Sequence, residues 1–237
     1  MITVINADIR RTIISMTGNS NAAHVAVALS EVEILNAVYS RHQGWPQEVP
    51  LDEPGNSSPI VARGKVFVTQ SLEDGSRRCL ISFDRKTGEK LWQRETSYAE
   101  KEPTHKTNPF CSASPSTNGE VVVVNHGSAG MFAYDFSGKE LWRRIDLDSQ
   151  RHIWGTAASP VPYANTFIQH RGPGPRVYLI ALTADTGKTL WKRDLPKSQS
   201  KDEKHWFGSW STPVLRNNNG RDELLLGLPK RLDRIYV

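Results

Sequence analysis

The sequence predicts an all-β protein assembled from repeated, four-stranded antiparallel units. The first indication is a short phrase that occurs three times, as residues 86–92, 137–142 and 186–191. The tryptophans that end these phrases are 50 and 49 residues apart, and Trp45 precedes the first of them by 47 residues. The second indication is a Ser-Pro or Thr-Pro dipeptide with a similar pitch. Landmarks at near-constant spacing are typical of one supersecondary unit per period.

Each phrase joins two predicted strands. It follows an apolar run, such as residues 79–83 or 177–182, and opens a shorter run at the tryptophan. The Thr-Gly or Ser-Gly pair between the runs favours a hairpin turn, in which glycine adopts the positive φ that other residues resist. We therefore expect turns at Gly88, Gly138 and Gly187.

Two further strands precede each hairpin. The dipeptides that mark the first of them are Ser58-Pro59, Ser114-Pro115, Ser159-Pro160 and Thr212-Pro213. Four short strands in each period indicate one blade of a β-propeller. The expected blades are 57–95, 111–147 and 156–195, and a fourth starts at residue 208. The alternative is a β-sandwich with accidental similarity, although a sandwich has no reason to repeat its turn chemistry at a fixed pitch.

The fullest copy of the phrase, residues 84–92, resembles the pyrroloquinoline-quinone (PQQ) type repeat of quinoprotein alcohol dehydrogenase-like propellers. The resemblance covers residues 45–237, and it implies that Trp45, Trp92, Trp142 and Trp191 dock between adjacent blades. It is a weak guide to function. Quinone-dependent dehydrogenases, a propeller lipoprotein of outer-membrane assembly and many bacterial propellers of unknown role share this repeat.

The number of blades predicts an open arc. The resembled family closes its ring with eight blades, whereas this chain has about three complete units plus partial ones. The next tryptophan is due about 49 residues after Trp191, beyond Val237. We expect an arc of an eight-bladed type of ring, whose other blades were lost by truncation or come from a partner. The alternative is a small closed ring in which the strand at Trp45 completes the fourth blade.

Residues 1–44 do not fit the repeat. Apolar residues spaced by three and four over 22–39 favour one amphipathic helix. Arg10-Arg11 and the short apolar run after them are too brief for a clear export signal. The resemblance nevertheless implies the periplasm or cell envelope. The sequence has no apolar run of the length that a membrane-spanning helix needs.

Charge and cysteine content exclude several classes of protein. The 30 basic and 25 acidic side chains are interspersed, so no basic stripe forms that would favour nucleic acid. Two cysteines make neither a disulfide framework nor a zinc site. We expect Cys79 and Cys111 to be buried free thiols, with a disulfide as the alternative.

The connections between blades carry the candidate site. They should bring histidines and tryptophans from neighbouring blades to one rim, where indole rings offer stacking area and polar groups offer anchors. The rim candidates are His105, Lys106, Asn108, His152, Trp154, His205, Trp206 and Trp210. The alternative is that the histidines bond loop backbone while the tryptophans seal the joints between blades. A metal site of His105, His152 and His205 is disfavoured because adjacent blades hold them too far apart.

Two further histidines, His126 and His170, end predicted second strands. We interpret them as ordinary edge residues, with a place on the ligand-binding side as the alternative.

No catalytic constellation is predicted. Dehydrogenases of the resembled family use two adjacent cysteines over PQQ and a calcium site, and Cys79 and Cys111 are not adjacent. We therefore predict a non-catalytic module in the bacterial cell envelope that binds or scaffolds a protein partner, with a small-molecule ligand as a further option and no cofactor. The alternatives are a fragment of a PQQ-dependent oxidoreductase, with PQQ and calcium, and a sensor propeller attached to another protein.

Overall fold

The computed structural model describes residues 49–53, 55–195 and 209–237. Within them, residues 51–83 and 90–237 form one compact unit, and the turn at 84–89 is described on its own. The predicted helix at 22–39 and the landmark Trp45 lie outside the described residues.

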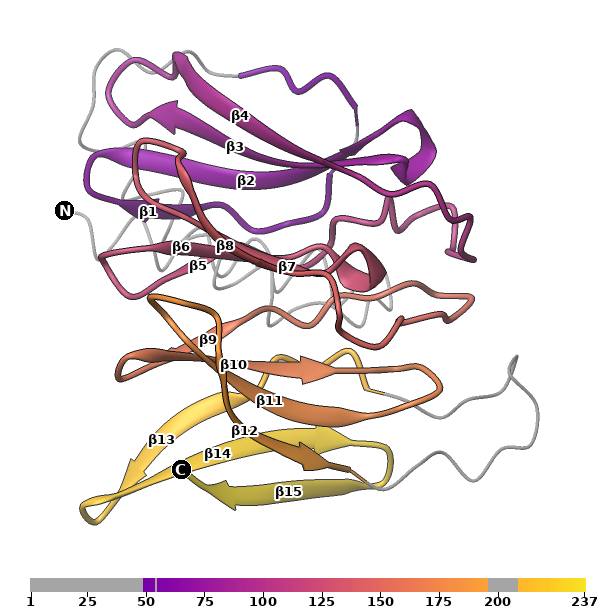
Figure 1. Cartoon of the computed structure of the whole chain (residues 1–237), viewed down its shortest axis with the longest axis vertical. Helices are drawn as coiled ribbons and strands as arrows, with labels where there is room; N and C mark the ends of the chain where they lie inside the picture. Colours follow the sequence, from indigo (N-terminus) through magenta and orange to yellow (C-terminus); the bar gives the residue numbers. More distant parts are fainter. Residues whose placement is uncertain (1–48, 54, 196–208) are drawn as a thin grey trace, which may run out of the picture. The chain divides into compact units, whose positions relative to one another are not determined.

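Four antiparallel sheets follow one another in chain order (Figure 1). Blade 1 consists of β1 (Ile60–Ala62), β2 (Lys65–Leu72), β3 (Arg77–Asp84) and β4 (Lys90–Ser97). Blade 2 consists of β5 (Ser116–Thr117), β6 (Val122–Asn125), β7 (Met131–Tyr134) and β8 (Glu140–Arg144). Blade 3 consists of β9 (Val161–Tyr163), β10 (Thr166–Arg171), β11 (Tyr178–Thr183) and β12 (Thr189–Asp194). Blade 4 has three described strands, β13 (Val214–Asn218), β14 (Arg221–Leu228) and β15 (Arg231–Tyr236).

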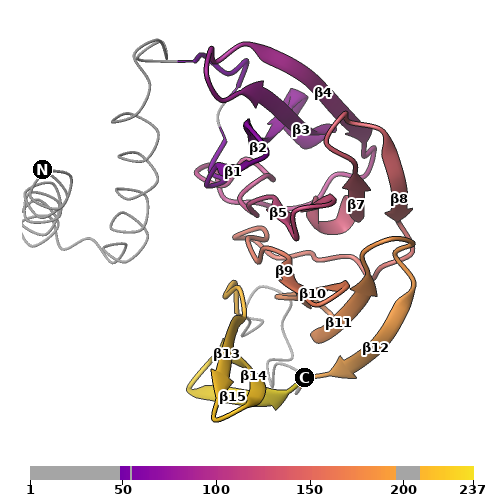
Figure 2. The same ribbon diagram turned by 90° about the vertical axis from the view of Figure 1, so that its left-hand side faces the viewer.

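Each sheet is a meander in which every strand pairs with the next one along the chain. Two single-turn 3₁₀ helices, η1 (Glu73–Gly75) and η2 (Gly127–Ala129), form the middle turns of blades 1 and 2. Figure 2 shows the first strands β1, β5, β9 and β13 along one side of the sheets, and β4, β8 and β12 along the other. Strand β9 contacts both β5 and β13. This is the arrangement of propeller blades around an axis, and the described sheets do not close into a ring.

The repeated phrase forms the turn between the third and fourth strands, as predicted. Gly88, Gly138 and Gly187 have φ of 74°, 86° and 66°. In the turn at 84–89 the Asp84 carboxylate accepts hydrogen bonds from the backbone N–H groups of Thr87 (2.9 Å) and Lys86 (2.7 Å). These bonds stabilise the ionised form and lower the pKa of Asp84. The phrase therefore encodes the turn locally.

The core lies between the blades. We call the joints between blades 1 and 2, 2 and 3, and 3 and 4 seams 1, 2 and 3. Seam 1 packs Phe67 and Leu80 against Val122 and Phe132, and seam 2 packs Val123 and Met131 against Phe167 and Ile180. Seam 3 packs Ile168 and Leu179 against Leu224 and Leu226. Because both faces of blades 2 and 3 are covered, the middle strands β6, β7 and β11 are nearly continuous apolar runs instead of alternating patterns.

The repeat tryptophans lie at these successive seams. Trp92 packs in seam 1, Trp142 in seam 2 and Trp191 in seam 3. The indole N–H of Trp92 donates to Phe136 O (3.2 Å), and that of Trp142 donates to Ala184 O (2.8 Å). Each acceptor lies one or two residues before the repeated phrase of the following blade, so the turn of that blade supplies part of the docking surface of the indole.

The Ser-Pro landmark has a structural role of its own. The backbone N–H of Ser58 donates to Ser114 Oγ (2.9 Å), that of Ser114 to Ser159 Oγ (2.9 Å), and that of Ser159 to Thr212 Oγ1 (3.0 Å). The proline that follows each of them has no N–H group, so the Ser or Thr is the last donor before the first strand. These bonds form a ladder of equivalent contacts that crosses all three seams.

Candidate functional site

Two rim loops present the predicted site residues. Residues 98–115 connect blade 1 to blade 2, and residues 145–160 connect blade 2 to blade 3. The imidazole of His105 stacks on the indole of Trp154, with ring centroids 4.5 Å apart and an interplanar angle of 30°. Lys106, beside His105, is exposed. The stack joins the two loops, whose residues are far apart in the sequence.

Asn108 uses its side chain to hold the two loops together. Its Nδ2 donates to Trp154 O (2.8 Å) and Thr156 O (3.4 Å), and its Oδ1 accepts from Ser112 Oγ (2.7 Å). Gly155, with φ of 69°, lies against this amide, and a Cβ there would be 2.6 Å from Asn108 Nδ2. Both ends of the amide are therefore engaged, the nitrogen with the backbone of the second loop and the oxygen with the Ser112 hydroxyl.

His152 and Trp210 form a second ring pair. The buried His152 meets the Trp210 indole edge to face, with centroids 5.0 Å apart. Its Nδ1 accepts a hydrogen bond from the Trp154 N–H (3.1 Å), and the Trp210 indole N–H donates to Gly155 O (2.9 Å). The structure thus brings together His105, Asn108, His152, Trp154 and Trp210, whereas His205 and Trp206 lie outside the described residues.

The outer surface of this cluster is apolar. Trp154 is 51% exposed and Ile153 is 42% exposed, although both are large hydrophobic residues. The exposed cations Lys101, Lys106 and Arg151 lie on the same loops. Arg151 donates to Lys101 O (3.2 Å), which ties these loops together at another point. The rim therefore offers an indole and an aliphatic side chain on a hydrogen-bonded framework, which is a common composition of protein-binding surfaces.

A buried ion pair below the rim is absent from the sequence-based predictions. The Arg78 guanidinium lies 2.5 Å from Glu102 Oε1, and the two side chains are 2% and 6% exposed. It also donates to His126 O (2.5 Å) and lies over the rings of Tyr98 and Phe110. Glu102 belongs to the first rim loop, so this pair anchors the loop to blade 1. No local signal marks it, because both residues occur within ordinary charged stretches.

His126 and His170 lie at the ends of the second strands, where the sequence places them, and both are buried. Both rings have no exposed surface, because seams cover the ends of the second strands. Burial lowers the pKa of His126 to about 3 and that of His170 to about 4, since the charged ring would lose its hydration. His170 Nδ1 donates to Ser211 O (3.1 Å) across seam 3. Neither ring is placed to exchange protons with a ligand.

The cysteines are free and buried, in agreement with the sequence-based expectation. Burial raises the pKa of both Cys79 and Cys111 to about 12, so neither thiol is activated as a nucleophile. Among the residues that the structure describes, no three His, Cys, Asp or Glu gather in a metal-binding group. Over the same residues, no helix has the length and apolar character needed to cross a bilayer.

Blades of this construction, joined by an indole and a Ser/Thr-Pro ladder, define a β-propeller with PQQ-like repeats. A family model described as outer membrane protein assembly factor BamB matches residues 37–145 and 104–221. The matches cover most of the chain, and the protein belongs to this family of PQQ-like repeats. No curated protein sequence matches it.

Two solved structures with a TM-score above 0.5 show the same fold. A quinohemoprotein alcohol dehydrogenase from Pseudomonas putida HK5 has 16% identity and a TM-score of 0.54 over 77% of this chain and 30% of its own. The quinohemoprotein alcohol dehydrogenase from Comamonas testosteroni has 15% identity and a TM-score of 0.53 over 73% of this chain and 29% of its own. BamB from Moraxella catarrhalis has 17% identity and a TM-score of 0.42 over 75% of this chain and 57% of its own. The chain thus spans about 30% of the length of the two enzymes.

The described residues do not fit the cofactor site that the resemblance implies. That site needs two adjacent cysteines and a calcium ligand set, whereas Cys79 and Cys111 are separate buried thiols with raised pKa values. No reaction step through a quinone is therefore derived from these residues.

Proposed function

We propose that this protein is a non-catalytic propeller module that binds a protein partner in the bacterial cell envelope. The observation that carries the proposal is the exposed pair Ile153 and Trp154 on a rim where the side chains of Asn108, Arg151 and His152 already bond loop backbone. An indole held by stacking on His105 is an ordered hydrophobic anchor. Such an anchor loses little conformational entropy when a partner covers it, and buried tryptophans are frequent hot spots of protein interfaces.

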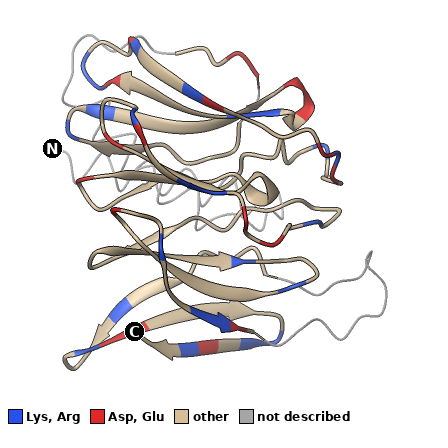
Figure 3. Cartoon of the chain, in the orientation of Figure 1, with Lys and Arg blue, Asp and Glu red and all other residues tan. Residues whose placement is uncertain are grey.

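The charge distribution also favours a protein partner over a nucleic acid. Over the residues that Figure 3 colours, Lys and Arg are interspersed with Asp and Glu along most strands and loops. The proposed envelope location is supported by the family description, which names a factor of outer-membrane protein assembly. Subcellular fractionation of the native host tests this location directly.

Binding is tested by chemical cross-linking in an envelope extract, with tagged wild-type protein, Trp154→Ser and Leu190→Ser. Leu190 is 63% exposed on an outer strand and serves as the matched control. We expect specific cross-linked proteins with wild type and Leu190→Ser, and their loss with Trp154→Ser. Equal recovery with all three proteins would show that the rim is not the binding surface.

A fragment of a PQQ-dependent oxidoreductase is the second candidate, because two solved structures that match the chain with a TM-score above 0.5 are quinohemoprotein alcohol dehydrogenases. Titration with PQQ and calcium, followed by absorbance after gel filtration, distinguishes the candidates. A stoichiometric complex would favour the enzyme fragment over the binding module.

A further inference from the structure

In each of the three seams, the earlier blade presents two recurring kinds of side chain to the blade that follows it. At the first position, Thr69, Asn125 and His170 are equivalent buried residues of the second strands of blades 1 to 3, each two residues after the one that pairs with the start of the first strand. Each bonds the carbonyl that precedes the Ser/Thr-Pro of the following blade: Thr69 Oγ1 to Ala113 O (2.9 Å), Asn125 Nδ2 to Ala158 O (3.0 Å) and His170 Nδ1 to Ser211 O (3.1 Å).

At the second position a small residue pairs with the repeat tryptophan. Ser82 is opposite Trp92, Ala133 is opposite Trp142 and Ala181 is opposite Trp191. A small side chain leaves room for the indole to lie over the sheet and enter the seam. The polar residue that bonds the next blade and the small residue opposite the tryptophan thus both recur in the three blades that pack against a following blade.

Blade 4 has neither feature. The register aligns Leu225 with Ile168, because Val214 pairs with Leu225 as Val161 pairs with Ile168. Gly227 then takes the position of His170, and Arg234, which pairs with Leu225, takes the position of Ala181. Glycine has no side chain to reach a carbonyl, and a guanidinium occupies the place of the small residue. This face is therefore not built to receive another blade of the same repeat.

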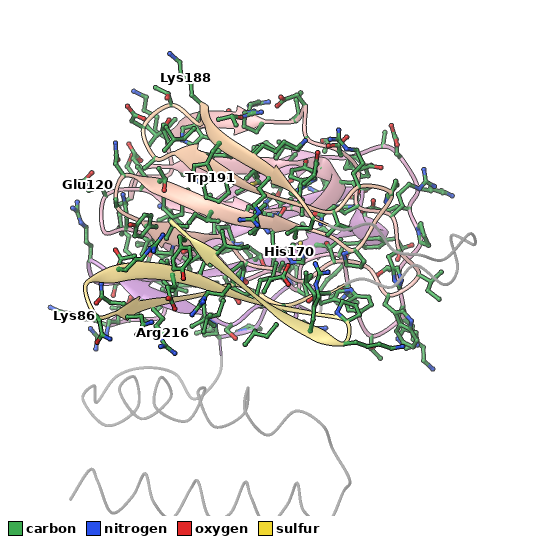
Figure 4. All side chains as sticks on the ribbon, turned by 90° about the horizontal axis from the view of Figure 1, so that it is seen from below. Lys86, Glu120, His170, Lys188, Trp191 and Arg216 are labelled. Carbon is green, nitrogen blue, oxygen red and sulfur yellow. The ribbon has the colours of Figure 1, made fainter. Side chains whose placement is uncertain are left out.

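The face has a different composition from the three seams. Paired residues of an antiparallel sheet share a face, so Val214, Leu225, Leu232 and Tyr236 lie on one side of blade 4 with three arginines. We call this side the outer face of blade 4. It is opposite to Leu224, Leu226 and Ile235, which pack into seam 3. Figure 4 views the molecule from the end where β13–β15 lie in front, with Arg216 labelled.

Large apolar side chains are exposed on the outer face. Val214 is 60% exposed, Leu232 is 67% exposed and Tyr236 is 45% exposed. Isolated exposed hydrophobic residues are ordinary, whereas several on one open sheet face mark an interaction surface.

The charges of the outer face are mainly positive. Arg216 and Arg234 lie 3.9 and 3.8 Å from Glu223, whose side chain is only 3% exposed, and Arg221 lies 3.4 Å from the Tyr236 ring centroid. Two arginines thus flank one buried carboxylate, and a third lies over the tyrosine ring on the same face. The excess positive charge, next to aliphatic groups and a tyrosine, is complementary to acidic side chains.

We propose that the outer face of blade 4 binds an extended segment of a partner protein in which acidic residues alternate with aliphatic ones. In a segment that pairs with the edge strand β15, successive side chains lie on opposite sides, so the acidic ones can lie beside the outer-face arginines and the aliphatic ones on the side of Ile235. The outer face of blade 4 is separate from the rim, so binding at the two surfaces can be tested independently.

The test uses fluorescence anisotropy of a labelled heptapeptide that alternates Glu with Val, and of its counterpart that alternates Lys with Val. We expect the Glu peptide to bind at least about tenfold more tightly than the Lys peptide, and its binding to weaken with added salt. Equal binding of the two peptides, or binding of neither, would overturn the proposal.

Two pairs of variants locate the binding surface. Leu232→Ser and Arg216→Gln are each expected to weaken binding of the Glu peptide about tenfold. Their controls are Leu190→Ser, with 63% exposure in place of 67%, and Arg143→Gln, whose side chain is 59% exposed compared with 53% for Arg216. Equal losses in the controls would contradict the assignment. Leu232→Ser keeps the test valid if Arg216→Gln lowers stability by leaving Glu223 less well paired.

Sedimentation velocity tests whether the outer face of blade 4 binds a second copy of this protein instead of a partner segment. If wild-type protein dimerises and Leu232→Ser is monomeric, the face binds a second copy and the proposal is wrong. Trp154→Ser is expected to bind the Glu peptide as wild type does. If Trp154→Ser loses its cross-linked partners but binds the Glu peptide with unchanged affinity, the substitution has affected the rim and not the outer face of blade 4.

Discussion

The turn glycines of the repeated phrase provide a sharp test of how the blades dock. Gly187 has φ of 66°, and a Cβ at this position would lie 2.6 Å from Trp142 Cδ2 and 2.7 Å from Cε3. Gly187→Ala therefore combines two penalties. The backbone conformation is strained for any residue with a side chain, and the methyl group collides with an indole ring that seam 2 holds on its other side.

The two penalties can be separated with a control. Gly220 has φ of 83°, and a Cβ there would meet nothing within 4 Å. Gly220→Ala thus carries the backbone strain alone, about 1–2 kcal/mol. Overpacking in a filled core adds about 1–3 kcal/mol. We expect Gly187→Ala to lose about 2–5 kcal/mol in free energy of unfolding, more than Gly220→Ala by the overpacking term.

Urea denaturation followed by tryptophan fluorescence measures both variants. The predicted result is a lower midpoint for Gly187→Ala than for Gly220→Ala at similar m-values, because the folded surface is otherwise unchanged. Equal destabilisation of the two variants would refute the reasoning, because it would mean that Trp142 does not press on the turn of the following blade.

Two further predictions concern buried charge. The folded pKa values of His126 and His170, about 3 and 4, lie below the ordinary value of 6.5, so the unfolded chain binds more protons below pH 6.5. The free energy of unfolding should be fully retained above that pH and fall by about 1.4 kcal/mol per pH unit for each histidine as the pH decreases towards 4.5. Urea titrations at pH 7.5, 5.5 and 4.5 should show this decrease, reduced in His126→Phe; an unchanged slope in the variant would contradict it. Glu102→Gln leaves Arg78 buried without its ion pair and should cost about 3–5 kcal/mol, whereas Glu95→Gln, at an exposed pair, should cost less than about 1 kcal/mol. Thermal melts compare the two variants, and equal Tm values would argue against an anchoring role for the buried pair.

The repeat pattern is sufficient to predict the blades because their turns are encoded locally. The carboxylate, hydroxyl and glycine of residues 84–88 close the hairpin within five positions, and the apolar runs on either side form β3 and β4. The Ser/Thr-Pro landmarks likewise mark the starts of first strands. Their hydrogen-bond ladder, however, is visible only when adjacent blades are aligned in space.

The candidate site is predicted less completely, because its contacts connect loops that are far apart in the sequence. His105 and Trp154 are both identifiable as rim residues, but their stacking depends on how two loops approach each other. Asn108 is predicted as a polar anchor for a ligand, and the sequence gives no sign that its amide nitrogen also bonds the backbone of the second loop. Arg78 and Glu102 give no local signal, since the value of a charge pair depends on burial that only the assembled blades create.

Amide hydrogen exchange at four equivalent positions tests the central claim, that the repeats stack as blades joined by one repeated seam. The N–H groups of Ser58, Ser114 and Ser159 each donate across a seam, whereas Thr212 is exposed and has no described acceptor for its N–H. We predict that the three serine amides exchange about a hundredfold more slowly than the Thr212 amide. Similar rates at all four positions would contradict the account, because the seam ladder would then be absent in solution.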